Sequence, residues 1–167
     1  MSKRLLLLIL ISLYIASGFA VASEMKPEEV TNKVKEAYFF LSELKQSGIT
    51  VFNDNNGQFS WKSTYVFILN CETQTFVAHP KSGAYRGNSF EHFQDKKGLY
   101  FLKTACQNTN STTGTWIEYW WQKSGEKKLS RRILYMITVP AIHLQVAASI
   151  YNVSHSIDEL NKLTHPN

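Results

Sequence analysis

An arginine at the start of an apolar run is the feature of this chain that most directly indicates chemistry. Arg132 precedes Ile133 and Leu134 in a segment whose pattern predicts an inner strand of a sheet. A charge at such a position needs an anion, because an unpaired buried charge is costly and a carboxylate accepts charge-assisted hydrogen bonds. Arg131 competes for this role, since neighbouring residues of a strand point to opposite faces. The sequence therefore predicts an anion-binding site and leaves the choice between the two arginines open.

Aromatic residues just upstream are candidates for the wall of such a site. The segment 115–121 alternates, and its two faces carry Ile117, Tyr119 and Trp121 on one side and Trp116, Glu118 and Trp120 on the other. Only one face can line a pocket, so Trp116 and Tyr119 are not both expected to contact a ligand. Core packing is the alternative role of these aromatic side chains, and the sequence leaves it open.

Metal binding, cofactor binding and catalysis are not predicted. The histidines are scattered, without a partner at the spacing of a zinc site: His79, His92, His143, His155 and His165. No serine has the strand–turn–helix setting that presents a nucleophile. His79, directly before Pro80, is expected either to fix its loop by a backbone hydrogen bond or to contact a ligand. The pattern favours a binding protein over an enzyme.

The first 22 residues have the composition of a secretory signal peptide. Lys3 and Arg4 precede an apolar run, and Ala20 and Ala22 fit a cleavage site, so we expect cleavage after Ala22 and a periplasmic protein of one domain. A retained anchor helix is the alternative. The formal net charge of the chain is +5, and the leader supplies Lys3 and Arg4. The remaining charge is too low to predict nucleic-acid binding.

The two cysteines, Cys71 and Cys106, are expected to form a disulfide. An exported chain matures in an oxidising compartment, where disulfides persist, and only one pairing exists. On the chain-entropy model such a bond stabilises by roughly 3–4 kcal/mol.

Hydrophobic periodicity predicts an α+β fold in which a long N-terminal helix packs on an antiparallel sheet of about five strands with an inserted helix. The expected helices cover residues 24–46, 98–107 and 157–163, and the expected strands cover 65–70, 75–78, 115–123, 129–139 and 144–151. Residues 49–59 are expected to form a loop, because their Asn, Asp and Gly residues tolerate turn geometry.

Short motifs follow one another along the chain in a characteristic order. They are Phe52–Asn53, Tyr65 with Phe67 and Asn70, His79–Pro80, Gly87–Asn88, Asp95 with Gly98, Trp116 with Tyr119 and Trp121, Arg132 with Tyr135, and Ile150–Tyr151. In this order and spacing they resemble a single Cache domain, the PAS-like extracytoplasmic sensor module of bacterial receptors. The resemblance covers residues 24–155 and leaves residues 156–167 as a short C-terminal helix and tail. Arg132 stands where this family commonly has a lysine, and Ser149 where it tends to have a glycine.

The resemblance implies a sensor that binds a small organic acid, such as acetate, lactate, pyruvate or propionate. The ligand-binding residues expected from it and from the strand patterns are Arg132, Arg86, Tyr119, Trp121, Tyr65, His79 and Tyr135. Arg86 is included because its loop covers the pocket in this fold. We expect the free-standing periplasmic form of the module, which would signal through a separate membrane receptor or kinase. The alternative is an envelope interaction subunit that uses the same scaffold without a ligand.

Overall fold

The computed structural model of the protein describes residues 25–81, 83, 85–109, 113–151 and 153–164. Its helices are α1 (Pro27–Leu44), the 3-10 helix η1 (Lys45–Asn53), α2 (Phe101–Asn108), the 3-10 helix η2 (Pro140–Ile142) and α3 (Ile157–Thr164). Its strands are β1 (Ser60–Trp61), β2 (Thr64–Asn70), β3 (Thr75–Ala78), β4 (Thr115–Gln122), β5 (Leu129–Val139) and β6 (Leu144–Tyr151). The signal peptide predicted at residues 1–22 lies outside the described residues.

The strands form one antiparallel sheet in the order β1-β2-β6-β5-β4, with β3 paired to β2. The predicted strands 75–78, 129–139 and 144–151 are confirmed to the residue, and β1 is an additional short strand. β5 lies between β4 and β6, so the segment that holds Arg132 is an inner strand, as predicted. The α+β fold with an N-terminal helix and an inserted helix is confirmed.

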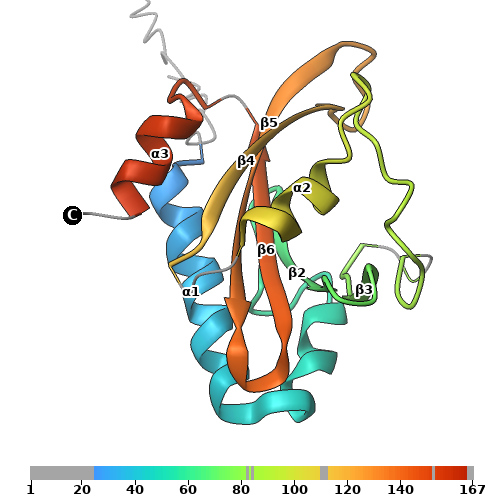
Figure 1. The fold of residues 1–167 in the computed structure, drawn as a ribbon, viewed down its shortest axis with the longest axis vertical. Helices are drawn as coiled ribbons and strands as arrows, with labels where there is room; N and C mark the ends of the chain where they lie inside the picture. The colour runs from blue at the N-terminus through green and yellow to red at the C-terminus, as the bar shows by residue number, and fades with distance from the viewer. Residues whose placement is uncertain (1–24, 82, 84, 110–112, 152, 165–167) are drawn as a thin grey trace, which may run out of the picture.

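Helices cover both faces of this sheet (Figure 1). α1 and α3 lie on one face, whereas α2 and the long segment between β3 and α2 lie on the other. Alternation along β5 divides its side chains between the two faces: Ile133 and Tyr135 join the core beneath α1, and Leu134 and Met136 join the core beneath α2. A slip of the register by one residue would exchange these sets, so the two cores fix the face on which Arg132 lies.

α1 forms where apolar residues recur every three or four positions. The residues that it buries against the sheet are Val30, Val34, Ala37 and Leu41. Pro27 suits the first turn, where a backbone N–H has no partner inside the helix. The loop predicted after this helix needs correction, because residues 45–53 form η1. There Phe52 is buried and stacks on Phe59 with 4.1 Å between ring centroids, a tertiary contact that overrides the turn preference of its neighbours.

α2 begins at Phe101, three residues later than predicted. The Asp95 carboxylate accepts hydrogen bonds from the N–H groups of Lys97 at 2.8 Å and Leu99 at 2.9 Å, and Gly98 has a φ of +86°. This turn holds the backbone outside the helical region, so the helix can begin only after it. Leu99, which lies outside the helix, is 39% exposed, whereas Phe101 in its first turn is buried.

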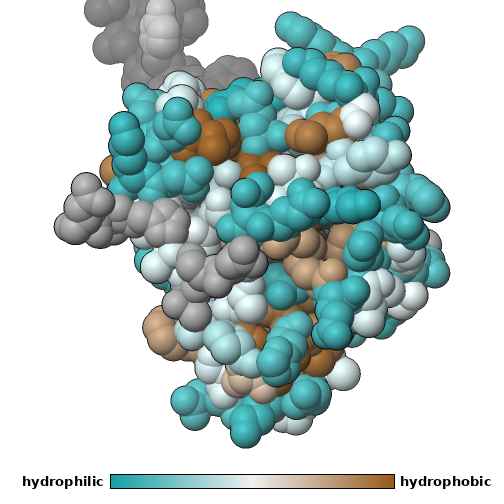
Figure 2. Space-filling view, viewed as in Figure 1, coloured by the Kyte–Doolittle hydropathy of each residue, from teal (hydrophilic) through white to brown (hydrophobic). Residues whose placement is uncertain are grey.

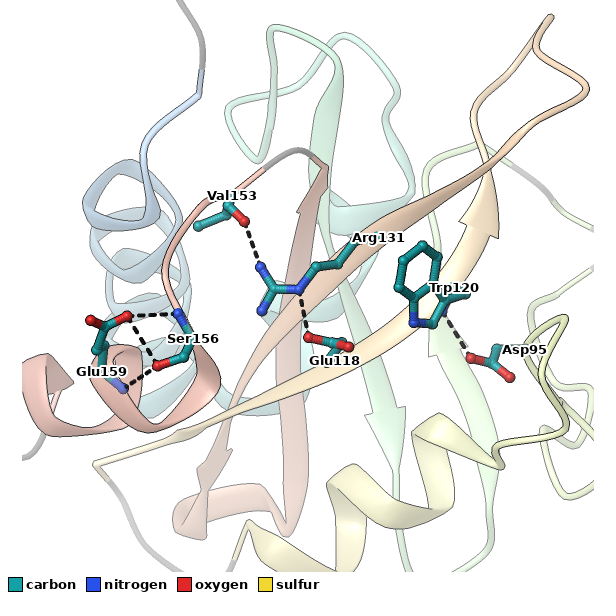
Figure 3. A network of polar contacts seen from close by, with 7 residues as sticks. All are labelled: Asp95, Glu118, Trp120, Arg131, Val153, Ser156 and Glu159. Carbon is teal, nitrogen blue, oxygen red and sulfur yellow. Dashed lines mark hydrogen bonds and ion pairs between the residues drawn. The ribbon is translucent and has the colours of Figure 1, made fainter.

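A disulfide and backbone hydrogen bonds to β3 and β4 hold what we call the cover, residues 79–81, 83 and 85–108, on the sheet. The disulfide between Cys71 and Cys106 joins the end of β2 to α2, with the two Cα atoms 5.5 Å apart, which confirms the predicted pairing. Asp95 also accepts a hydrogen bond from the Trp120 N–H at 2.9 Å (Figure 3). The Lys96 N–H donates to the Trp120 carbonyl oxygen. β4 is an edge strand of the sheet, so its outer backbone groups have no neighbouring strand to pair with. The bonds from the cover give partners to the N–H and carbonyl groups of Trp120 on this edge.

Candidate ligand-binding site

A small cavity of about 100 Å³ lies between the sheet and the cover. Its lining comes from the sheet, with Tyr65, Phe67, Phe76, Tyr119, Trp121, Arg132 and Ser149, and from the cover, with His79, Tyr85, Phe93, Phe101 and Leu102. Aromatic rings make most of the wall and a few polar groups converge on it, which is the usual composition of a small-molecule site.

On the face seen in Figure 2 the surface is mainly hydrophilic, and hydrophobic residues reach it in small separate patches.

Arg132 is the formally charged residue of this lining. β5 places it opposite Tyr119 of β4 and Tyr151 of β6. Its guanidinium carbon lies 5.7 Å from the Tyr119 ring centroid and 4.7 Å from that of Tyr151, and its Nη1 donates to the Tyr151 hydroxyl at 3.4 Å. Its Nε is buried without a hydrogen-bond partner, and none of the ion pairs between described residues includes Arg132. A buried cation in this state lacks the anion that would offset its desolvation.

The protonation states around Arg132 suit an anion. Burial opposes the charge of the guanidinium, but the neighbouring hydroxyls of Tyr119, Tyr151 and Tyr65 raise the pKa of Arg132 above its ordinary value, so it stays cationic. Burial raises the pKa of Tyr119 and of Tyr65. Both phenols therefore keep their protons at neutral pH and can donate hydrogen bonds.

Arg131 has a different environment on the other face of β5. Its side chain pairs with Glu118 and donates to the carbonyl oxygen of Val153 (Figure 3). This pair borders a wider and more open hollow of about 460 Å³, lined further by residues 153–158. Because the Arg131 guanidinium already has a carboxylate partner, the smaller cavity at Arg132 is the better anion site. The structure thus favours Arg132 over Arg131.

His79 lies directly after β3 and lines the same cavity. Its backbone N–H donates to Asn53 Oδ1 at 3.2 Å, but this bond belongs to the main chain and not to the imidazole, so it does not show the loop-fixing role predicted for the histidine. Its ring lies edge-on to the rings of Tyr65 and Tyr85, at 4.9 and 4.8 Å between centroids. Its Nδ1 is buried and has no hydrogen-bond partner among the described residues. The ring is therefore placed for contact with a ligand, the other predicted alternative.

The His79 imidazole should make the stability of the protein depend on pH. Burial, together with the charges of Arg132 and Lys81, lowers its pKa from 6.5 to about 4. Between these values the unfolded chain binds a proton that the folded chain does not, so the free energy of unfolding falls as the pH drops. The full loss below pH 4 is about 3 kcal/mol relative to pH 7. Urea unfolding at pH 7 and below pH 4 measures the free energy of unfolding at the two ends of this range. Its fall between them should be larger in the wild type than in His79→Asn, and an equal fall in both proteins would contradict the prediction.

The structure brings most of the predicted ligand-binding residues together. Arg132, Tyr119, Trp121, Tyr65 and His79 all line the cavity. As the alternation of β4 predicts, Trp116 lies in the opposite core and does not share this wall with Tyr119.

The predictions that Tyr135 and Arg86 bind the ligand need correction, because neither residue lines the cavity. Tyr135 is an odd number of residues from Arg132 and points to the opposite face, where its hydroxyl donates to the Thr113 carbonyl oxygen at 2.6 Å. Its ring packs 5.0 Å from that of Trp116, and Gly114 is required beside it, because a Cβ atom there would meet the Tyr135 hydroxyl. Arg86 is exposed on the cover and does not belong to the lining.

Several lining residues are not singled out by the sequence patterns. Phe101 stacks on Tyr119 with 4.1 Å between ring centroids, and Phe93 and Tyr85 bring two more rings from the cover. Ser149, noted only as a departure from the family, also lines the cavity. The available signal was the density of aromatic residues between β3 and α2, since such rings must bury their apolar area against another surface.

Comparison with known proteins decides the family. The family model described as Cache domain matches residues 27–162. The chain belongs to the Cache domain family. Cache domains are extracytoplasmic sensor modules, and the resemblance found in the sequence is confirmed. In the part of this Cache domain that the structure describes, no helix is both long and apolar enough to span a bilayer.

Solved structures share the fold of this Cache domain. A Cache chemosensory domain studied for carboxylic acid recognition has a TM-score of 0.61 at 15% identity, with 77% of this chain and 94% of that one covered. The periplasmic sensor domain of a chemotaxis protein has a TM-score of 0.56 at 14% identity, with 76% and 90% covered. A methyl-accepting chemotaxis protein from Vibrio parahaemolyticus has a TM-score of 0.55 at 14% identity, with 80% and 89% covered. No curated protein matches the chain. At these identities the similarity shows the fold alone.

Proposed function

We propose that this Cache domain is a periplasmic sensor that binds one small monocarboxylate at Arg132. The observation that carries the proposal is the buried Nε of Arg132, which has no hydrogen-bond partner, in a side chain that forms no ion pair among the described residues. A carboxylate that enters the cavity loses its hydration shell, and charge-assisted hydrogen bonds of about 1.5–3 kcal/mol each offset that loss. The similar Cache domain studied for carboxylic acid recognition supports the same ligand class.

The size of the cavity limits the ligand to a few heavy atoms. Its volume of about 100 Å³ is below the roughly 300–1,000 Å³ of pockets for drug-sized ligands. An acid of about six heavy atoms, at a ceiling of about 1.5 kcal/mol per atom, gains at most about 9 kcal/mol. We therefore expect dissociation constants in the micromolar to millimolar range. Tyr119 and Trp121 would wall the apolar end of the acid.

A ligand in this cavity contacts the sheet and the cover together, which provides a route for a signal. Phe101 and Tyr85 of the cover line the same space as Arg132 of β5. An acid that binds one arrangement of sheet and cover more tightly than another favours that arrangement by its difference in affinity. We propose that a membrane receptor or kinase responds to this shift, and that residues 1–22 are the leader that exports the protein.

Docking to an envelope partner without a ligand is the less favoured function. The large exposed apolar side chains of the described residues lie on α1, just before α2 and on α3: Phe39, Leu44, Leu99, Tyr100 and Leu163. Exposed apolar residues of this kind are ordinary on a protein surface. A buried polar group without a partner is unusual and requires an explanation, which a bound acid supplies.

A thermal-shift panel of acetate, propionate, lactate and pyruvate tests the proposed function. At one hundred times the dissociation constant a ligand stabilises the fold by about 2.7 kcal/mol, which corresponds to a rise in Tm of about 5–10 °C for a domain of this size. Sodium chloride at the same ionic strength controls for general salt effects. At least one acid should raise Tm above this control. An unchanged Tm with all of them would count against a small-acid sensor and favour the docking subunit.

A further inference from the structure

We propose that the acid bound by this domain carries a hydroxyl group next to its carboxylate, and that His79 is the residue that selects it. The inference rests on the proposed function, because it requires the carboxylate to be held at Arg132. The observation that carries it is a second unpartnered polar atom in the cavity lining, Nδ1 of His79, whose side chain belongs to a residue that is only 6% exposed.

The two unpartnered atoms give the cavity two polar ends. Among the described residues, the other buried side-chain atoms without a partner belong to Gln74 and Trp116, which do not line this cavity. Tyr65 connects the two ends: its ring centroid lies 4.9 Å from that of His79, and its hydroxyl is close enough to Arg132 for that charge to act on its pKa. In about 100 Å³, an acid that contacts Arg132 has its remaining atoms within reach of the His79 wall.

The charges around the cavity disfavour a second carboxylate. Arg132 is the cation of the lining, and His79 is neutral at pH 7 because burial and the charges of Arg132 and Lys81 lower its pKa. The Lys81 ammonium lies 5.3 Å from the Tyr65 ring centroid, but Lys81 is not part of the lining. A second carboxylate would therefore be buried without a charged partner, which is costly. The group that meets His79 should be polar and uncharged.

A hydroxyl is the neutral group that suits either tautomer of a neutral imidazole. Nδ1 accepts a hydrogen bond when the proton is on Nε2 and donates one when it carries the proton itself. A hydroxyl can do both, a 2-oxo oxygen only accepts, and a methyl group does neither. The rings of Phe67 and Phe76 lie 5.8 and 6.0 Å from that of His79, which leaves an apolar wall for a hydrogen or a methyl group. The ligand class is therefore a short 2-hydroxy acid, such as glycolate or lactate.

Calorimetric titration with glycolate and propionate tests this inference. The two acids have the same number of heavy atoms and differ by a hydroxyl in place of a methyl group. We expect glycolate to bind at least about tenfold more tightly, because propionate leaves the buried Nδ1 unpaired. Lactate and 2-methylpropionate are a second matched pair with the same expected order.

Variants of His79 assign the preference to this residue. His79→Leu should abolish most of the preference for glycolate, and His79→Asn, whose amide lies near the position of Nδ1, should restore part of it. If His79→Leu does not fold, His79→Phe takes its place, since it keeps a ring of similar size without nitrogen.

The possible outcomes separate this inference from the proposed function. Equal affinity for glycolate and propionate, or a preference that survives the loss of the imidazole, would overturn the 2-hydroxy acid inference and leave the monocarboxylate site intact. The same holds if acetate, propionate or pyruvate binds and neither glycolate nor lactate does. If no acid binds the wild type, the proposed function itself fails.

Discussion

Arg132→Gln is expected to weaken the binding of a small monocarboxylate by at least about 100-fold, because two charge-assisted contacts correspond to about 10²–10⁴ in the dissociation constant. The glutamine amide can still donate a hydrogen bond, but it carries no charge and lacks the forked geometry that matches a carboxylate. Calorimetric titration with the acid that gives the largest rise in Tm measures this change.

Arg131→Gln is the matched control, since this neighbouring arginine lies on the other face of β5 and pairs with Glu118. It should leave the dissociation constant unchanged. The free energy of unfolding without ligand should separate the variants further. Arg132→Gln removes a buried cation that has no carboxylate partner and should cost little or even stabilise, whereas Arg131→Gln breaks an ion pair and should destabilise. If Arg131→Gln loses affinity and Arg132→Gln keeps it, the site is misplaced.

Removal of the disulfide should have the largest effect on stability. Replacing Cys71 and Cys106 together by alanine should lower the free energy of unfolding by about 2–5 kcal/mol, because the unfolded chain is no longer constrained by the closed loop. For a domain of this size the change corresponds to a fall in Tm of about 5–20 °C, measured by scanning calorimetry. The affinity for the acid should fall as well, since the bond anchors α2 and α2 brings Phe101 and Leu102 to the cavity.

Chemical reduction supplies the control for this prediction. A reducing agent should shift the Tm of the wild type toward that of the double variant and leave the double variant unchanged. Mass analysis of the unreduced wild type should show two hydrogens missing. The bond would be contradicted by two thiols that alkylate freely in the native, air-exposed protein.

Most of the correct predictions about the site come from the alternation of side chains between the two faces of a strand. Along β4 and β5 it places Arg132, Tyr119 and Trp121 on one face and Trp116 on the other, and the structure agrees. The prediction for Tyr135 rests on the family motif instead. Its odd distance from Arg132 already assigns it to the opposite face, so the strand geometry is the stronger guide where the two conflict.

The cover could not be predicted to the same depth. Side chains in a loop follow no period, so the sequence does not show that Tyr85 and Phe93 turn toward the cavity while Arg86 stays exposed. The start of α2 depends on Asp95, whose carboxylate also accepts a hydrogen bond from Trp120 of a distant strand. Contacts of this kind are decided by the tertiary structure and leave no local signal in the sequence.

A crystal structure grown with the tightest-binding acid of the panel tests the central claim most directly. We predict electron density for one acid in the cavity between the sheet and the cover, with its carboxylate oxygens about 2.7–2.9 Å from nitrogen atoms of Arg132. An ordered cavity that holds only water at saturating acid, or an acid bound elsewhere while the Nε of Arg132 stays unpaired, would contradict the account.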